Sequence, residues 1–382
     1  MTYPRPLQRT SNMDKYKTKM TIKKWFSYIN LNSLSGEAKV AIQKFNAYRK
    51  KLTFDCALKL FLFAINDETE SLRHLDKQLI NPNMKKTFGL DSISYSQLSR
   101  ALKDIDQAVL MEIFAQLLEM VKSKTAGYSK NKLYLIDSTT FSFGKKNCPW
   151  AIFRPTKSGV KLHLSLCFME DGLVHPEKFK ITNAHENDNK HLEVFINKKE
   201  AIYVFDRGYY EFKRFNQLVI DDYKFVTRLK SNTIINVKED YTNLENPNSL
   251  RDQLVTIGSK DDSQKFRMIT IPVKGKSDLV LITNLKDTEG YEATDIGNIY
   301  KSRWQIELFF KHIKQHMTIT TYFSKSEVGV HNQIILAMIA YLLTLLLKIE
   351  INTTKTIFQI LRIFRELKFE SMRYFLTFFD PG

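Results

Sequence analysis

Two different periodicities divide the chain, and they change near Gly127. From about residue 35 to residue 122, apolar side chains recur at the spacing of amphipathic helices, with polar breaks at residues 67–71 and 81–83. This pattern predicts a helical domain, preceded by a basic arm over residues 1 to about 30. The expected helices cover residues 38–49, 54–65, 71–78, 96–102 and 107–121.

Beyond Gly127 the pattern changes to short alternating or fully apolar runs, which are typical of strands. Two of these runs end in an acid, at Asp137 and at Asp206. Another, Val160–Phe168, alternates and predicts a strand with one apolar face. Residues 232–284 are strand-rich and polar, and we expect a β-rich insertion there. The other expected strands are 173–181 and 224–229.

One long apolar run, Ile334–Leu347, is shorter than the ~20 residues that a membrane-spanning helix needs. Polar residues flank it on both sides. We therefore expect a buried core helix, and no membrane.

An uninterrupted helix is predicted around residues 299–314, since apolar residues recur at helical spacing without Pro or Gly. At roughly 100° per residue, four polar side chains fall within an arc of about 60°. They are Tyr300, Arg303, Glu307 and Lys314. A carboxylate beside a phenol and two cations suits a metal ion next to a phosphodiester, whereas a solvated charged face is the alternative. Trp304 points off this stripe and is expected to pack.

The charge balance favours a polyanionic partner. Lys and Arg total 58 against 41 Asp and Glu, which gives a net charge of +17. Nucleic acid is the first candidate and a membrane surface the second. Only three cysteines occur, without a CxxC pair, so neither a disulfide framework nor a zinc knuckle is supported, and a reducing cytoplasm fits.

A short helix after Ser94 is a candidate for DNA recognition. Gln97 and Arg100 are placed to reach base edges, with Ser96 and Lys103 near phosphates. An ordinary amphipathic helix packed through its leucines explains the same pattern, and the sequence leaves both interpretations open.

Three acids form the candidate catalytic set. Asp137 and Asp206 each end a predicted strand, at the sheet edge where ligands gather in α/β folds, and Glu307 lies on the later helix. Three carboxylates prefer Mg²⁺ or Mn²⁺, and two such ions suit in-line attack on phosphorus. Asp also commonly caps the segment after a strand, which is the structural alternative. The sequence lacks HExxH, GxGxxG, P-loop and GxSxG motifs.

The spacing Tyr300-x2-Arg303-x3-Glu307-x6-Lys314 resembles the YREK signature of bacterial insertion-sequence transposases with a DDE triad. The segments that begin at Asp137 and Asp206 resemble those that hold the first two acids of this family. The resemblance implies an α/β, ribonuclease-H-like catalytic core and cut-and-paste transposition through a hairpin. It also implies that the three acids bind two Mg²⁺ ions, while Tyr300, Arg303 and Lys314 hold phosphates of the DNA.

The expected organisation follows from this resemblance. We expect a DNA-binding helical domain over 1–125, a core in two parts over 126–230 and 285–350, the insertion over 231–284, and helices over 351–382. The implied partners are double-stranded DNA, namely terminal inverted repeats and target, and a second copy of the chain in a synaptic complex. A bacterial cytoplasm is the implied location. No residue is assigned to trapping a flipped base. A metal-dependent nuclease without strand transfer and a non-catalytic DNA-binding regulator remain alternatives.

Overall fold

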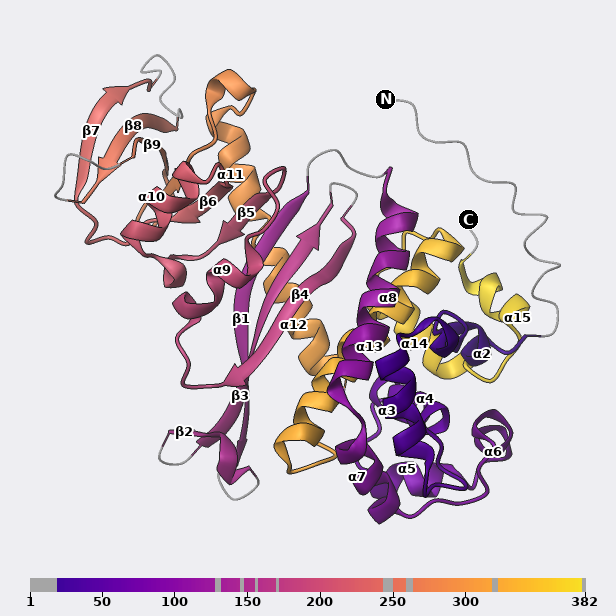
Figure 1. Cartoon of the computed structure of the whole chain (residues 1–382). Helices are drawn as coiled ribbons and strands as arrows, with labels where there is room; N and C mark the ends of the chain where they lie inside the picture. The colour runs from indigo at the N-terminus through magenta and orange to yellow at the C-terminus, as the bar shows by residue number, and fades with distance from the viewer. Residues whose placement is uncertain are drawn as a thin grey trace. The chain divides into compact units, whose positions relative to one another are not determined.

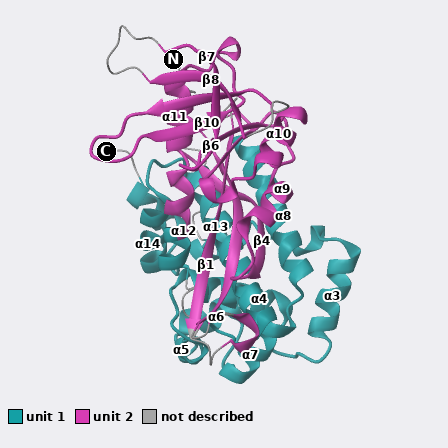
Figure 2. Ribbon diagram, turned by 90° about the vertical axis from the view of Figure 1, so that its left-hand side faces the viewer, with its two compact units in different colours: residues 1–125, 311–382 teal, residues 126–310 magenta. Residues whose placement is uncertain are grey.

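The computed structural model describes residues 19–127, 132–144, 148–154, 157–169, 172–242, 250–258, 264–317 and 322–379. Most of the expected basic arm, residues 1–18, therefore lies outside the described residues. The chain forms two compact units. Unit 1 comprises residues 1–125 and 311–382, and unit 2 comprises residues 126–310, coloured separately in Figure 2.

Unit 1 is helical, as the periodicity of its first part predicts. Its described helices of more than three residues are α2 (Thr21–Phe26), α3 (Gly36–Asn46), α4 (Phe54–Asn66), α5 (Leu72–Gln78), α6 (Pro82–Phe88), α7 (Tyr95–Asp104), α8 (Gln107–Thr125), α13 (Glu327–Ile351), α14 (Ile357–Leu367) and α15 (Met372–Leu376). Side-chain caps begin most of them. The Ser94 hydroxyl, for example, accepts from the backbone N–H of Gln97 at the start of α7.

The long helix α13 is the centre of unit 1. It is apolar on all sides, so it needs other helices around it, and it packs against α8, α4, α7 and α14. Buried polar groups fix its position: the Asn332 amide donates to the carbonyls of Leu102 and Ile105 at 2.8 and 2.9 Å. By length and composition it would suffice to cross a membrane, but 83% of its most apolar window is buried inside the protein. The expected core helix is confirmed, and the chain segment 311–350 groups with the N-terminal helices.

Unit 2 is built on one sheet, which among the described residues has ten strands. They are β1 (Leu133–Gly144), β2 (Ile152–Arg154), β3 (Lys157–Phe168), β4 (Val174–Asn183), β5 (Ile202–Phe205), β6 (Lys224–Arg228), β7 (Ile235–Asp240), β8 (Arg251–Ile257), β9 (Phe266–Ile271) and β10 (Leu279–Thr283). The order is β2-β3-β1-β5-β6-β10-β9-β8-β7, with β4 paired to β3. Strands β1, β5 and β6 run parallel, and the other pairs are antiparallel. Figure 1 shows β1 and β3 as two long neighbouring strands.

Helices cover both faces of this sheet. Alternation along β5 sends Tyr203 and Phe205 into a core with α9 (Leu192–Phe195) and α10 (Phe212–Ile220). Ile202 points to the opposite core, which includes Ile296 of α11 (Ala293–Lys301). The result is a mixed α/β unit of ribonuclease-H-like type. The strands of residues 231–284 continue the same sheet, because β10 pairs directly with β6.

Three local predictions differ from the structure. The expected single helix over 299–314 is wrong, since α11 ends at Lys301 and α12 (Trp304–His316) begins three residues later. Asp137 does not end its strand, because β1 continues to Gly144. The alternation over residues 160–168 predicts one apolar face, whereas the polar side chains of His163 and Ser165 on the other face of β3 are buried as well.

Candidate active site

The strand register of unit 2 places two of the three predicted acids next to each other. Strands β1 and β5 pair in parallel, with Ile136 opposite Phe205 as the last pair. The following residues are Asp137 and Asp206, so the two carboxylates leave neighbouring strands at the same level. Strand β1 continues to Gly144, whereas β5 ends at Phe205. The end of β5 leaves room for the site beside Asp137.

Backbone hydrogen bonds orient both aspartates. The Asp137 Oδ1 accepts from the N–H of Ser138 at 2.7 Å, and the Asp206 Oδ1 accepts from the N–H of Gly208 at 2.6 Å. A β-carbon at Gly208 would lie 2.8 Å from that same Oδ1, so the close approach of the loop requires glycine. Asp206 also caps the short turn Arg207–Tyr209, so the capping alternative applies to it as well.

Glu307 joins the aspartates through Arg303. The Arg303 Nη2 donates to the Glu307 Oε1 at 2.6 Å, and its Nη1 lies 3.7 Å from the Asp137 Oδ2. The guanidinium therefore lies between a carboxylate of β1 and one of α12. The Arg303 guanidinium also lies 5.8 Å from the centre of the Tyr300 ring.

Burial and neighbouring charge act on the central acid in opposite directions. The pKa of Asp137 is raised to about 6 on balance: burial raises it most, and the carboxylates of Asp206 and Glu307 also raise it, while the Ser138 N–H and Arg303 lower it. Burial also raises the pKa of Tyr300, against the influence of Arg303. These influences require the three acids to lie within electrostatic range of one another.

The donor set fits divalent metal ions, although the three carboxylates do not surround a common point. Among the described residues, no three His, Cys, Asp or Glu side chains already lie where they would hold one ion. The Arg303 guanidinium occupies the region between two of the acids instead. The Tyr209 hydroxyl is buried without a hydrogen-bond partner, and its pKa is raised by burial and by the charges of Asp137 and two further aspartates. Hard carboxylate oxygens around a buried, unpartnered hydroxyl suit Mg²⁺ or Mn²⁺ and their water ligands.

A buried polar cluster beside Asp137 was missed by the sequence analysis. The Asp188 Oδ1 accepts from the Ser138 hydroxyl at 2.7 Å and forms an ion pair with the Lys161 ammonium at 3.2 Å. His163, opposite Ser138 in the register, is buried with its Nδ1 3.5 Å from the same oxygen. The available signal was the set of polar side chains at alternate positions of β3, opposite its predicted apolar face.

The other predicted site residues belong to unit 1. Lys314 is on α12 beyond the boundary between the units, in the part that groups with unit 1. Gln97 and Arg100 are exposed on α7 in unit 1. The Gln97 side-chain oxygen accepts from the backbone N–H of Ser94, so this amide also serves as a helix cap.

Trp304 does not pack as expected, because its side chain is 57% exposed. It borders a cavity of about 570 Å³ together with Tyr300 and Arg303. Apolar side chains of Leu250 and Ile271 line the same cavity.

Comparison with known proteins finds related sequences. Residues 128–343 match the profile of the family described as "Transposase DDE domain". A Geobacillus stearothermophilus protein, named as a transposase for insertion sequence element IS5377, is 27% identical over 75% of this chain and 74% of its own length. A Synechocystis protein, named as a transposase for element IS4SA, is 26% identical over 83% and 88% of the two chains. A Sinorhizobium fredii protein, named as transposase y4zB, is 31% identical over 62% and 66%.

Proposed function

This chain belongs to the family of transposases with a DDE domain, and we propose that it cuts and joins DNA at the terminal inverted repeats of its insertion sequence. The observation that carries the proposal is the grouping of Asp137 and Asp206 by the register of β1 and β5, with Arg303 linking Asp137 to Glu307. These residues come from separate parts of the chain, and the capping role of an aspartate alone does not account for their convergence.

We assign the three acids to metal binding and catalysis. Asp137, Asp206 and Glu307 would hold two Mg²⁺ ions, with Mn²⁺ as a substitute, in keeping with the divalent-metal chemistry of the family. When bound, such ions activate a water or a 3′-hydroxyl and stabilise the leaving oxygen during in-line attack on phosphorus. The N–H groups of Ser138 and Gly208 keep one oxygen of each aspartate in place, which leaves the second oxygen for the ligand.

The DNA next to the cut would lie against the cations of the site. In the structure, Arg303 neutralises part of the charge of two acids, and its remaining N–H groups suit a phosphate oxygen. We assign Tyr300 and Lys314 to the same phosphates. The exposed Trp304 ring, beside the cavity that it shares with Arg303, offers a stacking surface for a base at the DNA end.

The test separates chemistry from binding. Asp137→Asn, Asp206→Asn and Glu307→Gln are each expected to abolish Mg²⁺-dependent cleavage of a duplex that carries the terminal repeat, while affinity for that duplex is retained. The repeat is read from the DNA that flanks the open reading frame. Cleavage that survives in one of these variants would remove that residue from the metal site.

A supercoiled acceptor plasmid separates transposition from simple nuclease activity. A transposase joins the cut end to the plasmid, whereas a nuclease only cuts. Hairpin-ended products on a denaturing gel would support the hairpin route. Specific binding without cleavage in Mg²⁺ or Mn²⁺ would favour a non-catalytic regulator. We further propose that two copies assemble on two DNA ends in the bacterial cytoplasm, which light scattering of the complex would test.

A further inference from the structure

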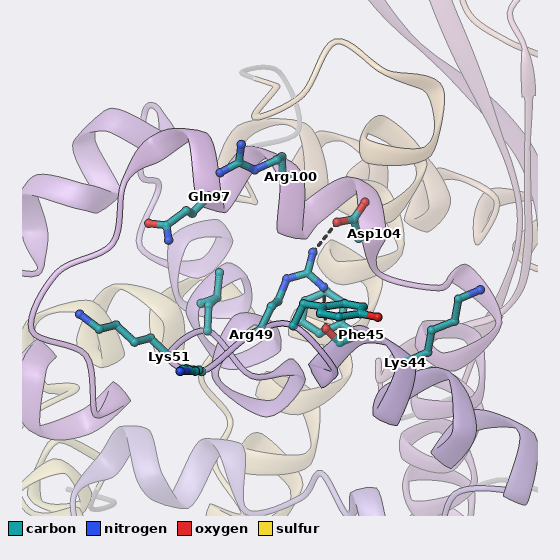
Figure 3. A pocket seen from close by; sticks show the side chains of 10 residues that line it. Lys44, Phe45, Arg49, Lys51, Gln97, Arg100 and Asp104 are labelled. Carbon is teal, nitrogen blue, oxygen red and sulfur yellow. Dashed lines mark hydrogen bonds and ion pairs between the residues drawn. The ribbon is translucent and has the colours of Figure 1, made fainter.

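A cationic cavity lies in unit 1, within a part of the chain that no catalytic residue occupies. The connection between α3 and α4, residues 47–53, forms one wall, and α7 forms the other. The cavity measures about 540 Å³. Its charged lining residues are Lys44, Arg49, Lys50, Lys51, Arg100 and Asp104, which gives five positive charges against one negative. Figure 3 shows Arg100 and Gln97 projecting from α7, and Arg49 and Lys51 from the opposite wall.

The α7 wall exposes one polar stripe by geometry. Leu98, Ala101 and Leu102 are buried, so α7 packs through that face. Gln97 and Arg100 lie three residues apart and Asp104 four residues further, which places them on one exposed face. The leucines of α7 therefore pack in the core, as the interpretation of an ordinary amphipathic helix predicts. The opposite face of α7 remains available to a partner.

The opposite wall is held at both ends. The Phe54 N–H at the start of α4 donates to the Asn46 side chain at 2.7 Å, and the Phe45 ring packs edge-on against Phe54 at 5.7 Å. Leu52, which lies between Phe45 and Phe54 in the sequence, is buried. These contacts hold the connection in one conformation, so its lysines are presented from a fixed backbone.

Arg49 on the wall opposite α7 is held by neighbouring groups. Its guanidinium stacks on the Phe45 ring at 3.9 Å and donates to the Phe45 carbonyl at 2.6 Å. It also pairs with Asp104, as the dashed line in Figure 3 shows. The carboxylate of Asp104 is thus the one negative group of the lining, and it offsets the charge of Arg49.

The other cations are available to a ligand. Lys44, Lys50, Lys51 and Arg100 are exposed, and none forms an ion pair with another residue in the described ranges. Tyr48 is 99% exposed at the same wall. Four exposed cations around a concave surface repel one another unless a polyanion neutralises them.

We propose that this cavity binds the phosphate backbone of double-stranded DNA, with Lys50, Lys51 and Arg100 contacting phosphates and Tyr48 lying against the adjacent sugars. The proposal rests on the proposed function, because a transposase must hold DNA away from the catalytic centre as well as in it. It adds the α3–α4 connection to α7 as a DNA-binding surface. Contacts of this kind position DNA without reading its sequence.

The first experiment removes three contacts. Lys50→Gln, Lys51→Gln and Arg100→Gln are combined, and binding to a fluorescein-labelled duplex of arbitrary sequence is measured by anisotropy between about 50 and 200 mM salt. Each phosphate contact contributes about 0.9 to the salt slope, so the slope should fall by about 2 to 3. At about 0.15 M salt this corresponds to about fivefold per contact, or about 100-fold in total.

A matched control carries the same loss of charge elsewhere in unit 1. Lys77, Lys86 and Lys124 are exposed and lie outside the cavity, and their combined replacement by Gln is expected to change affinity only slightly. Both triple variants should unfold at the wild-type temperature, since all six side chains are exposed. Equal loss of affinity in the two variants would overturn the proposal, because net charge alone would then explain binding.

A second variant predicts a gain. Asp104→Asn removes the negative charge and releases Arg49, so DNA should bind about fivefold more tightly at about 0.15 M salt. The thermal unfolding midpoint of Asp104→Asn is measured alongside, so that a gain in affinity is assigned to folded protein. Unchanged or weaker binding would overturn the role of the cavity. Loss of binding to phosphatidylserine vesicles by the cavity triple variant, with duplex binding intact, would assign the surface to a membrane instead.

These readouts are independent of the chemistry. An Asp137→Asn variant should bind the duplex as the wild type does and fail to cut it. If wild-type protein bound DNA with the expected salt slope but never cleaved it, the proposed function would fail and the assignment of the cavity would stand.

Discussion

Arg303 is expected to compete with metal ions for the acids of the candidate active site. Its guanidinium donates to Glu307 at 2.6 Å and lies 3.7 Å from Asp137. An ion that gathers these carboxylates must displace the guanidinium from them. Replacing Arg303 by Gln should therefore tighten metal binding, even though it removes a residue that we assign to DNA phosphates.

The size of this effect follows from the contacts that are lost. A hydrogen bond between charged groups contributes about 1.5–3 kcal/mol when buried, and an exposed ion pair about 0.2–1 kcal/mol. The side chains of Arg303, Glu307 and Asp137 are 19%, 34% and 23% exposed, between these limits. We expect about 1–2 kcal/mol, which corresponds to metal affinity about 5- to 30-fold higher in Arg303→Gln.

The assay is calorimetric titration of MnCl₂ into the DNA-free full chain. Lys301→Gln is the matched control, because Lys301 is exposed at the end of α11 and has no ion pair with the acids among the described residues. The same Arg303→Gln variant should cut DNA more slowly, since a phosphate donor is missing. Metal affinity that is unchanged or weaker than that of the wild type would refute the competition.

Three further substitutions test residues next to the catalytic acids. Gly208→Ala places a β-carbon 2.8 Å from the Asp206 Oδ1, so cleavage should fall by up to about 100-fold while the thermal unfolding midpoint barely moves. Asp188→Asn weakens the contact with Lys161, and we expect slower cleavage at unchanged DNA affinity, with a loss of about 1 kcal/mol in urea unfolding. Burial lowers the pKa of His163 to about 4, so the unfolded chain binds the proton first as the pH falls below 6.5. The free energy of unfolding should therefore be full above pH 6.5 and fall by roughly 2 to 3 kcal/mol as the pH drops through 4, and His163→Gln should flatten this profile.

The sequence predicts those elements whose apolar pattern follows directly from how they are buried. The strand that ends at Asp206 is apolar because both faces of β5 are covered, and it was found. The apolar run in α13 was found for the same reason. The partition into units was not found. Residues 311–350 were expected with the catalytic core, but they group with unit 1. No local pattern tells which domain surrounds a helix that is apolar on all sides.

Features that depend on long-range pairing were missed. The polar positions of β3 alternate as in a half-exposed strand, but His163 is buried, and its ring centre lies 4.4 Å from that of His191 in the short 3₁₀ helix Asp188–His191. Asp137 was expected to end a strand because it follows an apolar run, yet antiparallel pairing with β3 continues β1 to Gly144. The break between α11 and α12 contains no Pro or Gly. Its local signal is Ser302, whose hydroxyl donates to the Asn298 carbonyl at 3.2 Å and so competes with the helix backbone.

The break between α11 and α12 explains why Arg303 and Glu307 are still in contact, although the expected single helix is absent. Around Arg303 the backbone forms tighter hydrogen bonds between residues three apart, from the Arg303 N–H to the Tyr300 carbonyl and from the Ile306 N–H to the Arg303 carbonyl. The two helices therefore need not share an axis, and the guanidinium reaches Glu307 across the first turn of α12. The aspartates are positioned by strand register, whereas Glu307 is positioned by a helix and by one side-chain contact. In the structure Arg303 thus holds Glu307 near the aspartates, and an ion that binds the three acids would take over this contact, which is why changing Arg303 is the most direct test of the arrangement.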